Sequence, residues 1–338
     1  MKLPYRIGLL SQLGEYMLSA DPDWLEAKDR AYRENNWFIP EFVESATRNI
    51  AHAFLSKDRL EQWISNPAYA AFQEDLTRPK TIGIVMAGNI PLVGFHDWLS
   101  VFISGNQALV KFSSRDKVLI NHLLQKIASW SEEAGAMTRE AEMLKACDAY
   151  IATGSNNSSR YFEYYFNRYP HIIRKNRTSV SVLTGEETFA ELEALADDVY
   201  LYFGLGCRNV TKIYVPTDYD FVPLLEAFKK YNWMIDQHKY KNNYDYNLAI
   251  NLLNKKYYMT NGSILLIEDA SFFSPISQLN YEFYDPSDKP AEKLSGHPDL
   301  QCLVGKDGIP FGLSQQPGLG DYADGIDSLS FLAGLAQN

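Results

Sequence analysis

Residues 81–111, "TIGIVMAGNIPLVGFHDWLSVFISGNQALVK", decide the fold class. The segment opens with a short apolar, β-branched run ending in Gly88, which predicts a buried strand. A mostly buried helix is predicted from Pro91, because proline suits the first helical position. After a turn at Gly105 and Asn106, "QALVKF" predicts a second strand. The segment is therefore one strand–helix–strand unit, from which parallel sheets are built.

The same alternation continues along the chain. "RDKVLINHLLQKIASW" has apolar residues at helical spacing, "CDAYIATG" predicts a third strand, and "NNSSRYFEYYF" predicts another helix. This order is typical of a doubly wound parallel sheet. Ligands bind such sheets beyond the carboxyl ends of the strands. The corresponding turns here are "MAGNIP", "KFSSRD" and "ATGSNN".

The remaining segments complete an α/β architecture with two lobes. Residues 1–79 are predicted as an N-terminal helical segment and residues 80–180 as a Rossmann-like cofactor domain. Residues 181–310 form the second α/β lobe, with a helix near 188–202, then a Gly-Leu-Gly-Cys corner, and strands in "TKIYVP" and "GSILLIED". Residues 311–338 are rich in glycine and turn residues, so we expect an extended C-terminal arm.

Composition excludes several function classes. The 338 residues are 46% hydrophobic and 22% charged, as in soluble globular proteins, and carry a net charge of −10. Because Lys and Arg are dispersed, we expect no nucleic-acid partner. No signal peptide or long apolar run is apparent, so we expect a cytoplasmic protein without a membrane span. Three distant cysteines and six scattered histidines predict neither a disulfide framework nor a metal site.

Cys207 is the candidate nucleophile. It follows Gly204-Leu205-Gly206, and glycines let the backbone approach a ligand and leave amides that can stabilise an oxyanion. A nucleophilic cysteine also needs an exposed, electropositive setting. The alternative is a small buried side chain at a helix–strand corner, as for most free cysteines. Cys147 and Cys302 lie in apolar runs and are expected to be structural.

The three sheet-edge turns offer further ligand groups. Asn89 could donate to an oxyanion or could be a simple turn residue. Lys111, at the end of "ALVK", could reach a ribose or phosphate or could be solvated. Gly154 and Ser155 open a predicted helix whose N-terminus suits a pyrophosphate. The complete GxGxxG pattern is missing, so this motif is weak alone.

Six motifs together resemble the aldehyde dehydrogenase superfamily. They occur in the family's order and at roughly its intervals: "GIVMAGNIPL", "SGNQALVKFSS", "ATGSNN", "GLGCRNVTKIYV", "EDASFFSPISQL" and "GIPFG". The short chain and the tail "QQPGLGDYADGIDSLSFL" most resemble the LuxC-type acyl-CoA reductases. The resemblance covers about residues 80–335. It implies an aldehyde-dehydrogenase-like fold with a Rossmann-like cofactor domain and a catalytic domain.

The resemblance also implies roles for individual residues. Cys207 would be the nucleophile, and its backbone N–H and the Asn89 side chain would form the oxyanion hole. Lys111 would hold the adenosine ribose. The other residues implied in cofactor binding are Ala87, Gly154, Ser155 and Phe273.

Ser114 and Arg115 bear on the choice of cofactor. Ser114 stands three residues past Lys111, where NAD-preferring members often place a glutamate. A hydroxyl and a guanidinium admit a 2′-phosphate that a carboxylate would repel. We therefore expect NADPH, with NADH as the alternative. Arg115 pointing to solvent is the other interpretation.

Two departures from the superfamily pattern point to the reaction. Residues 175–185 contain no carboxylate, although hydrolytic members carry a general-base glutamate there. Without a base to activate water, a thioacyl enzyme should survive until it is reduced. Ser271 stands where the superfamily has a glutamate for the nicotinamide ribose.

The function that the resemblance implies is reduction of an acyl-CoA, or another acyl thioester, to an aldehyde through a thioacyl-cysteine. The alternatives are an aldehyde dehydrogenase, a reductase of an acyl phosphate or acyl adenylate, and a non-catalytic partner that channels acyl groups. An acyl-activating synthetase would then be a protein partner, and we expect a homo-oligomer.

Overall fold

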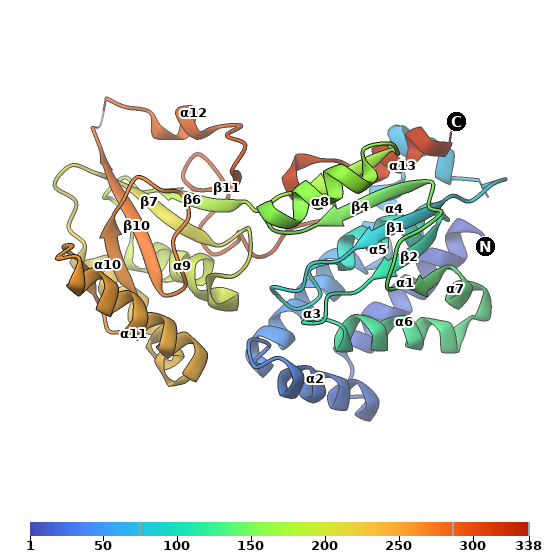
Figure 1. Ribbon diagram of the computed structural model, residues 1–338, viewed down its shortest axis with the longest axis horizontal. Helices are drawn as coiled ribbons and strands as arrows, with labels where there is room; N and C mark the ends of the chain where they lie inside the picture. Colours follow the sequence, from blue (N-terminus) through green and yellow to red (C-terminus); the bar gives the residue numbers. More distant parts are fainter. Residues whose placement is uncertain (75, 286, 337–338) are drawn as a thin grey trace. The chain divides into compact units, whose positions relative to one another are not determined.

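The computed structural model describes residues 1–74, 76–285 and 287–336. The chain forms two compact units, Met1–Asn176 with Pro317–Asn338 (unit 1) and Arg177–Gln316 (unit 2). Each unit contains a parallel sheet with helices, so the predicted α/β fold with two lobes is confirmed (Figure 1). The N-terminal helices and the C-terminal segment both belong to unit 1, whereas the sequence suggested four consecutive parts.

Unit 1 is built on a parallel sheet with the strand order β3-β2-β1-β4-β5 among the described residues. Its central strand β1 has a buried middle, as the apolar run "TIGIV" predicts. Two of the strands were not expected from the sequence, because β3 and β5 are short and mixed in polarity. The strands are β1 (Thr81–Val85), β2 (Gln107–Lys111), β3 (Thr138–Glu140), β4 (Ala149–Thr153) and β5 (His171–Arg174).

Helices cover this sheet and precede it. The prediction that a helix begins at Pro91 is wrong, because α5 begins at Phe95. Leu92 adopts a left-handed φ of 58°, which a helix cannot contain, so residues 91–94 form a turn instead. The helices are α1 (Leu3–Leu18), α2 (Pro22–Glu34), α3 (Pro40–Phe54), α4 (Lys57–Ile64), α5 (Phe95–Ser104), α6 (Val118–Trp130), α7 (Glu132–Ala136) and α8 (Asn156–Phe166).

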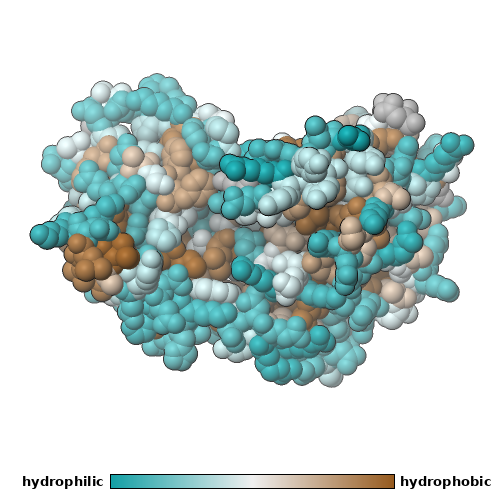
Figure 2. Space-filling view, viewed as in Figure 1, coloured by the Kyte–Doolittle hydropathy of each residue, from teal (hydrophilic) through white to brown (hydrophobic). Residues whose placement is uncertain are grey.

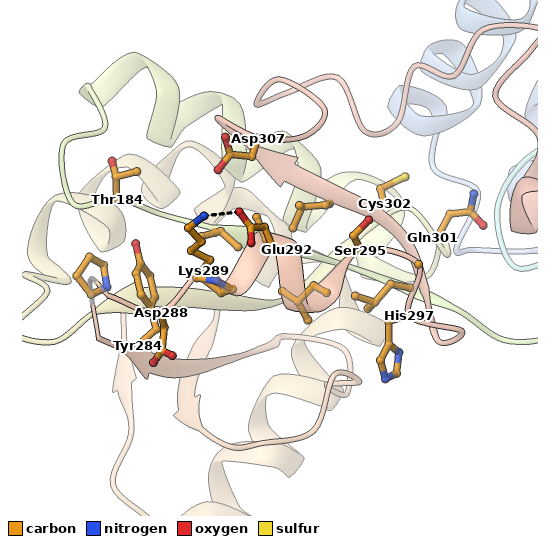
Figure 3. A pocket seen from close by; sticks show the side chains of 18 residues that line it. Thr184, Tyr284, Asp288, Lys289, Glu292, Ser295, His297, Gln301, Cys302 and Asp307 are labelled. Atoms are coloured by element: carbon orange, nitrogen blue, oxygen red, sulfur yellow. Dashed lines mark hydrogen bonds and ion pairs between the residues drawn. The ribbon is translucent and has the colours of Figure 1, made fainter.

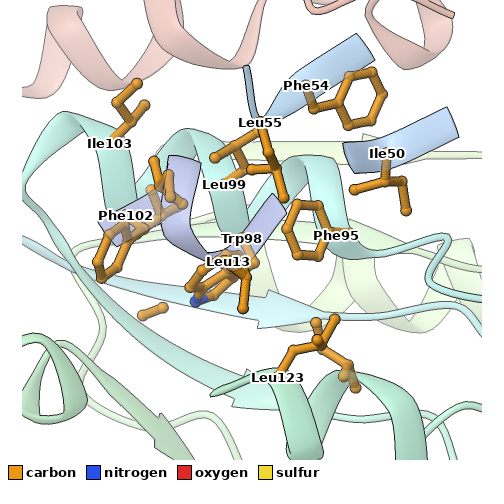
Figure 4. Close-up of a cluster of buried hydrophobic side chains, with 14 of the residues drawn as sticks. Leu13, Ile50, Phe54, Leu55, Phe95, Trp98, Leu99, Phe102, Ile103 and Leu123 are labelled. Carbon is orange, nitrogen blue, oxygen red and sulfur yellow. The ribbon is translucent and has the colours of Figure 1, made fainter. Parts of the chain in front are cut away.

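The N-terminal helices share one hydrophobic core with the sheet of unit 1 (Figure 4). Leu13 of α1 and Leu55, which follows α3, are buried with Phe95 and Leu99 of α5. Trp98 is fully buried, and its indole N–H donates to Thr138 Oγ1 at 2.9 Å. Because burying such side chains contributes about 1.5–3 kcal/mol each, the N-terminal helices are integral to unit 1.

The C-terminal segment is not simply an extended arm. Residues 317–327 are mostly irregular, with a short 3-10 helix at Ala323–Gly325. They are followed by α13 (Ser328–Ala336), a helix whose Leu329 and Leu332 are fully buried. Arg174, at the end of β5, donates to Ser328 Oγ and to Asp97 Oδ1, both at 2.8 Å. The apolar spacing in "SLSFLAGLA" is helical, and the glycine-rich residues before it obscured that pattern.

Unit 2 has a sheet with the order β11-β6-β7-β10-β9-β8 in the described part of the chain, parallel except for β8 against β9. Its strands are β6 (Thr178–Val182), β7 (Val210–Pro216), β8 (Met259–Thr260), β9 (Leu265–Glu268), β10 (Gln278–Tyr284) and β11 (Leu300–Gly305). Its helices are α9 (Phe189–Tyr200), α10 (Val222–Ala227), α11 (His238–Leu253) and α12 (Pro290–Leu294). The strands predicted in "TKIYVP" and "GSILLIED" correspond to β7 and β9, whereas β10 was not predicted.

The visible surface is mainly hydrophilic (Figure 2). Apolar side chains gather near the carboxyl end of α11, where Leu252 and Leu253 are exposed. Within the described residues, no helix combines the length and hydropathy that crossing a bilayer requires.

Candidate functional site

The sheet of unit 1 brings three predicted turns to one edge. Strand β1 lies between β2 and β4, and Val85 is in register with both Lys111 and Ala152. In a parallel sheet the carboxyl ends share an edge, and the order of the strands reverses between β1 and β4. The structure therefore gathers at this edge the residues predicted there: Ala87 and Asn89 after β1, Lys111 at the end of β2, Ser114 and Arg115 after it, and Gly154 and Ser155 after β4.

The chemical groups at this edge fit a dinucleotide with phosphates. Lys111, Ser114 and Arg115 are exposed, so an ammonium, a hydroxyl and a guanidinium face solvent near the ends of β1 and β2. Ser155 is the N-cap of α8, and its hydroxyl accepts from the Ser158 N–H at 3.3 Å. A helix N-terminus carries unpaired amides and partial positive charge, which suit a pyrophosphate.

The turn after β1 packs directly on the turn after β2. A Cβ atom at Gly88 would lie 2.3 Å from the Ser113 hydroxyl oxygen, so this approach requires glycine. Asp116 Oδ2 accepts from the Leu92 N–H at 2.7 Å. Asp116 was not predicted as a site residue, because an aspartate just before a helix ordinarily indicates an N-cap.

In unit 2, Cys207 lies in the corner between α9 and β7. The residues before it, Tyr202, Phe203 and Gly204, have φ values of 55°, 57° and 72°. Such a conformation costs free energy for Tyr and Phe, on the order of 1–3 kcal/mol each. It persists because both aromatic side chains are buried, so packing holds the corner. The two glycines of the sequence motif explain only part of this geometry.

Asn209 fixes the Cys207 corner. Its Oδ1 accepts from the Gly206 N–H at 2.8 Å. Its Nδ2 donates to the carbonyls of Leu201, Asp198 and Val199 at 2.8, 3.0 and 3.3 Å, so one buried side chain satisfies carbonyls at the end of α9. Asn209 was not predicted as a site residue, since nothing in the neighbouring sequence distinguishes it from a solvated loop asparagine.

The three cysteines differ in exposure, and all three lie in the described part of the chain. Cys207 is partly exposed, whereas Cys147 and Cys302 are buried. Burial raises the pKa of the Cys147 thiol, which reduces its thiolate fraction. Arg208 Nη1 donates to Cys302 Sγ at 3.2 Å. Cys207 is therefore the most exposed of the three thiols.

Phe273 lies in a loop that is tied to the strand after Cys207. Thr211 Oγ1 donates to the Phe272 carbonyl at 2.6 Å. Lys212, whose side chain is fully buried in β7, donates to the Ala270 carbonyl at 2.8 Å and pairs with Glu282 at 2.6 Å. Lys212 was not predicted as a structural residue, although a lysine inside the otherwise apolar strand "TKIYVP" indicates a buried partner.

Ser271, the departure from the superfamily's glutamate, is engaged within the same loop. Its hydroxyl donates to the Phe273 carbonyl at 3.0 Å. Asn280 Nδ2, from β10, donates to the carbonyls of Ser271 and Phe273 at 3.0 and 3.2 Å. The loop is thus fixed by its own backbone and by β10.

A cavity of about 810 Å³ lies elsewhere in unit 2 (Figure 3). Thr184 and Tyr284, at the carboxyl ends of β6 and β10, line it together with α12 and part of β11. Cys302 lines this cavity, but none of the predicted site residues does. Among the described residues, no group of three or more His, Cys, Asp or Glu side chains is placed to hold a metal ion.

Solved structures of aldehyde dehydrogenases are similar to this chain. One is the indole-3-acetaldehyde dehydrogenase of P. syringae with NAD+ and IAA, at a TM-score of 0.62 and 11% identity over 90% of this chain and 72% of that one. Others are the enzymes of Mycobacterium tuberculosis with NAD+ (0.61, 12%, 90% and 73%) and of Pseudomonas aeruginosa (0.59, 12%, 90% and 72%). At these identities the likeness shows the fold alone.

A sequence comparison identifies the family. No curated protein matches the chain by sequence. The family model described as "Acyl-CoA reductase (LuxC)" matches residues 42–229, which is more than half of the chain. The matched range includes both Asn89 and Cys207, so the resemblance found in the motifs is confirmed. The chain therefore belongs to the LuxC acyl-CoA reductase family.

Proposed function

We propose that this protein reduces an acyl-CoA, or a similar acyl thioester, to an aldehyde, with NADPH as the electron donor and NADH as the alternative. Membership of the LuxC family supports an oxidoreductase that acts on acyl or aldehyde groups. The observation that carries the proposal is the accessibility of Cys207, the partly exposed member of three cysteines, at a corner fixed by Asn209.

In the first half-reaction, the Cys207 thiolate attacks the thioester carbonyl carbon. The carbonyl oxygen becomes an oxyanion, which the Asn89 side-chain amide and the Cys207 backbone N–H stabilise. When the tetrahedral centre collapses, the bond to the CoA sulfur breaks and CoA leaves after protonation. The acyl group then remains as a thioester on Cys207.

In the second half-reaction, residues at the unit 1 edge hold the cofactor. Lys111 binds the adenosine ribose, and Gly154 and Ser155 at the start of α8 bind the pyrophosphate. Ala87 and Phe273 are the other residues for which the family resemblance implies a role in cofactor binding. A nicotinamide held there would supply the two electrons and one hydrogen that reduce the acyl carbon. The resulting thiohemiacetal collapses, which returns the electron pair to the Cys207 sulfur and releases the aldehyde.

The sequence of β6 explains why water would not intercept the acyl enzyme. The stretch from 175 to 185 contains β6, Thr178–Val182, and has no carboxylate. Without a general base, water attacks a thioester slowly. Reduction can then outrun hydrolysis, as an acyl-CoA reductase requires.

The test compares the wild type with Cys207→Ala and Cys147→Ala. Wild type and Cys147→Ala should oxidise NADPH on addition of acyl-CoA, and Cys207→Ala should not. Intact-mass spectrometry without cofactor, followed by peptide mapping, should show the acyl adduct on Cys207. Cys207→Ala should still fold and bind NADPH, because the proposed role of the thiol is to form the bond to the acyl group and not to stabilise the fold.

An adduct on Cys147 or Cys302, or normal turnover by Cys207→Ala, would overturn the assignment. Oxidation of an aldehyde to a free acid that is faster than acyl-CoA reduction would instead identify a hydrolytic aldehyde dehydrogenase. An acyl adduct that NADPH does not release would identify an acyl-channelling partner.

A further inference from the structure

The turn after β1 and the turn after β2 in unit 1 are in direct contact. The turn after β1 carries Asn89, and the turn after β2 belongs to the cofactor edge. The Met86 N–H donates to the Lys111 carbonyl at 3.1 Å, and Gly88 packs against Ser113 with no room for a Cβ atom. The position of Asn89 therefore depends on the turn after β2.

Asp116 connects these two turns through a buried hydrogen bond. The residue is 5% exposed, and its Oδ2 accepts from the Leu92 N–H at 2.7 Å. Its Oδ1 has no hydrogen-bond partner among the described residues. Burial raises the pKa of this carboxyl well above its ordinary value, and the backbone amides of Leu92 and Val93 oppose the rise. A buried carboxyl is thus held against the turn that carries Asn89.

Capping of its own helix does not account for Asp116. Helix α6 begins at Val118, its N-cap is Lys117, and no side chain caps it. Asp116 bonds instead to Leu92, which lies 24 residues earlier and has a left-handed φ of 58°. Leucine adopts that conformation unfavourably. The carboxyl therefore stabilises a strained turn that does not belong to its own element.

We propose that Asp116 is a positioning residue of the reductase: it accepts from the Leu92 amide and thereby keeps the Asn89 side chain in place to stabilise the oxyanion. The proposal rests on the role of Asn89 in the proposed function. Asp116 acts through Asn89 and touches neither substrate nor cofactor in this account. It also makes the position of Asn89 depend on the turn that carries Ser114 and Arg115.

The Leu92 N–H is buried and depends on Asp116 as its hydrogen-bond acceptor. If the acceptor is removed, the buried Leu92 N–H loses its partner, which is costly, and the strained turn can relax. Asn89 lies three residues before Leu92 in the same turn. A misplacement of about 1 Å can slow a reaction about 10²-fold, so relaxation of this turn should slow acylation.

The experiment measures single-turnover acylation of Cys207 by acyl-CoA without cofactor, using intact-mass spectrometry. Asp116→Leu, and the smaller Asp116→Ala if the leucine variant does not fold, should slow acylation about 10–100-fold. Asp116→Asn retains an acceptor and should retain most of the rate. The control is Asp148→Leu, since Asp148 accepts from the Thr81 N–H at 2.7 Å at the opposite end of β1. That control should change the rate less than about threefold.

A double-mutant cycle with Asn89→Ala separates the outcomes. If Asp116 acts through Asn89, the Asp116 substitution should have little further effect in the Asn89→Ala background. Fully additive losses, or equal losses in Asp148→Leu, would overturn the positioning role while leaving the proposed function intact. If Asn89→Ala alone does not slow acylation, the oxyanion assignment and this inference both fail.

Discussion

Replacing Asn209 by alanine should destabilise unit 2 and disorganise the Cys207 corner. The side chain accepts one hydrogen bond, from Gly206, and the two hydrogens of its amide serve three carbonyls. Three bonds at a net value of about 1 kcal/mol each give about 3 kcal/mol. The buried Gly206 N–H left without a partner adds about 1–3 kcal/mol. We therefore expect a loss of about 4–6 kcal/mol in the free energy of unfolding.

Urea unfolding is a suitable assay for this change. Trp233 lies in unit 2, so its fluorescence reports on that unit when the tryptophans of unit 1 are replaced by phenylalanine. The matched control is Asn254→Ala, at the exposed end of α11, which should change stability by less than about 0.5 kcal/mol. Asn209→Asp should also destabilise, because its second carboxylate oxygen would face the carbonyls that now accept from Nδ2.

The rate at which iodoacetamide alkylates Cys207 provides an independent readout. When Asn209 no longer holds the corner, the left-handed residues before Cys207 can relax. The alkylation rate of Asn209→Ala should therefore differ from that of the wild type by more than the rate of the Asn254→Ala control does. A loss below about 1 kcal/mol with an unchanged alkylation rate would refute this account, because water or a rearranged backbone would then replace the side chain.

Three further predictions concern unit 1. Asn89→Ala should lower kcat about 10²–10³-fold, the usual effect of losing one oxyanion donor, whereas a change confined to cofactor affinity would place Asn89 in the nicotinamide pocket. Ser114→Glu should shift kcat/KM toward NADH by about 1–3 kcal/mol, as a like-charge contact within about 4 Å would, and no shift would show that this turn does not read the 2′ position. Asp116 has a native pKa raised above its ordinary value near 3.8, so only the unfolded chain loses its proton as the pH rises from about 4. Wild-type stability should therefore fall relative to Asp116→Asn as the pH rises above about 4 toward the raised native pKa, and a stability difference between the two proteins that does not change with pH would contradict this.

Much of the fold was predictable because the hydrophobic pattern of each segment agrees with its burial in the folded protein. The run "TIGIV" is apolar and β-branched, and it forms the central strand β1. The sequence pattern gave a wrong or no prediction where contacts with distant residues determine the backbone conformation. Pro91 suits a helix start, but the left-handed backbone at Leu92 delays α5 to Phe95. Strand β10 mixes polar and aromatic residues, and one of its two pairing partners, β7, comes from a distant part of the chain.

The candidate site was predictable to the level of its motifs. Turns after β1, β2 and β4 share an edge whenever the sheet is parallel, so the gathering of Asn89, Lys111 and Ser155 follows from topology. The residues that hold these motifs were not predictable. Asn209 and Asp116 look like an ordinary loop asparagine and an ordinary helix cap, and only the three-dimensional structure shows the amides and carbonyls that they satisfy.

The interrupted path of the chain through unit 1 has a consequence for biosynthesis. Residues 177–316 are translated between the two segments of that unit, and Leu329 and Leu332 complete its core. At about 5–20 residues per second, the ribosome takes on the order of 10 s to reach them. During that interval every strand of the cofactor sheet has been made, but the surface that α13 will cover is open to water. Unit 1 thus completes its core only after unit 2 has been translated, and until then its uncovered apolar surface is open to chaperones and proteases.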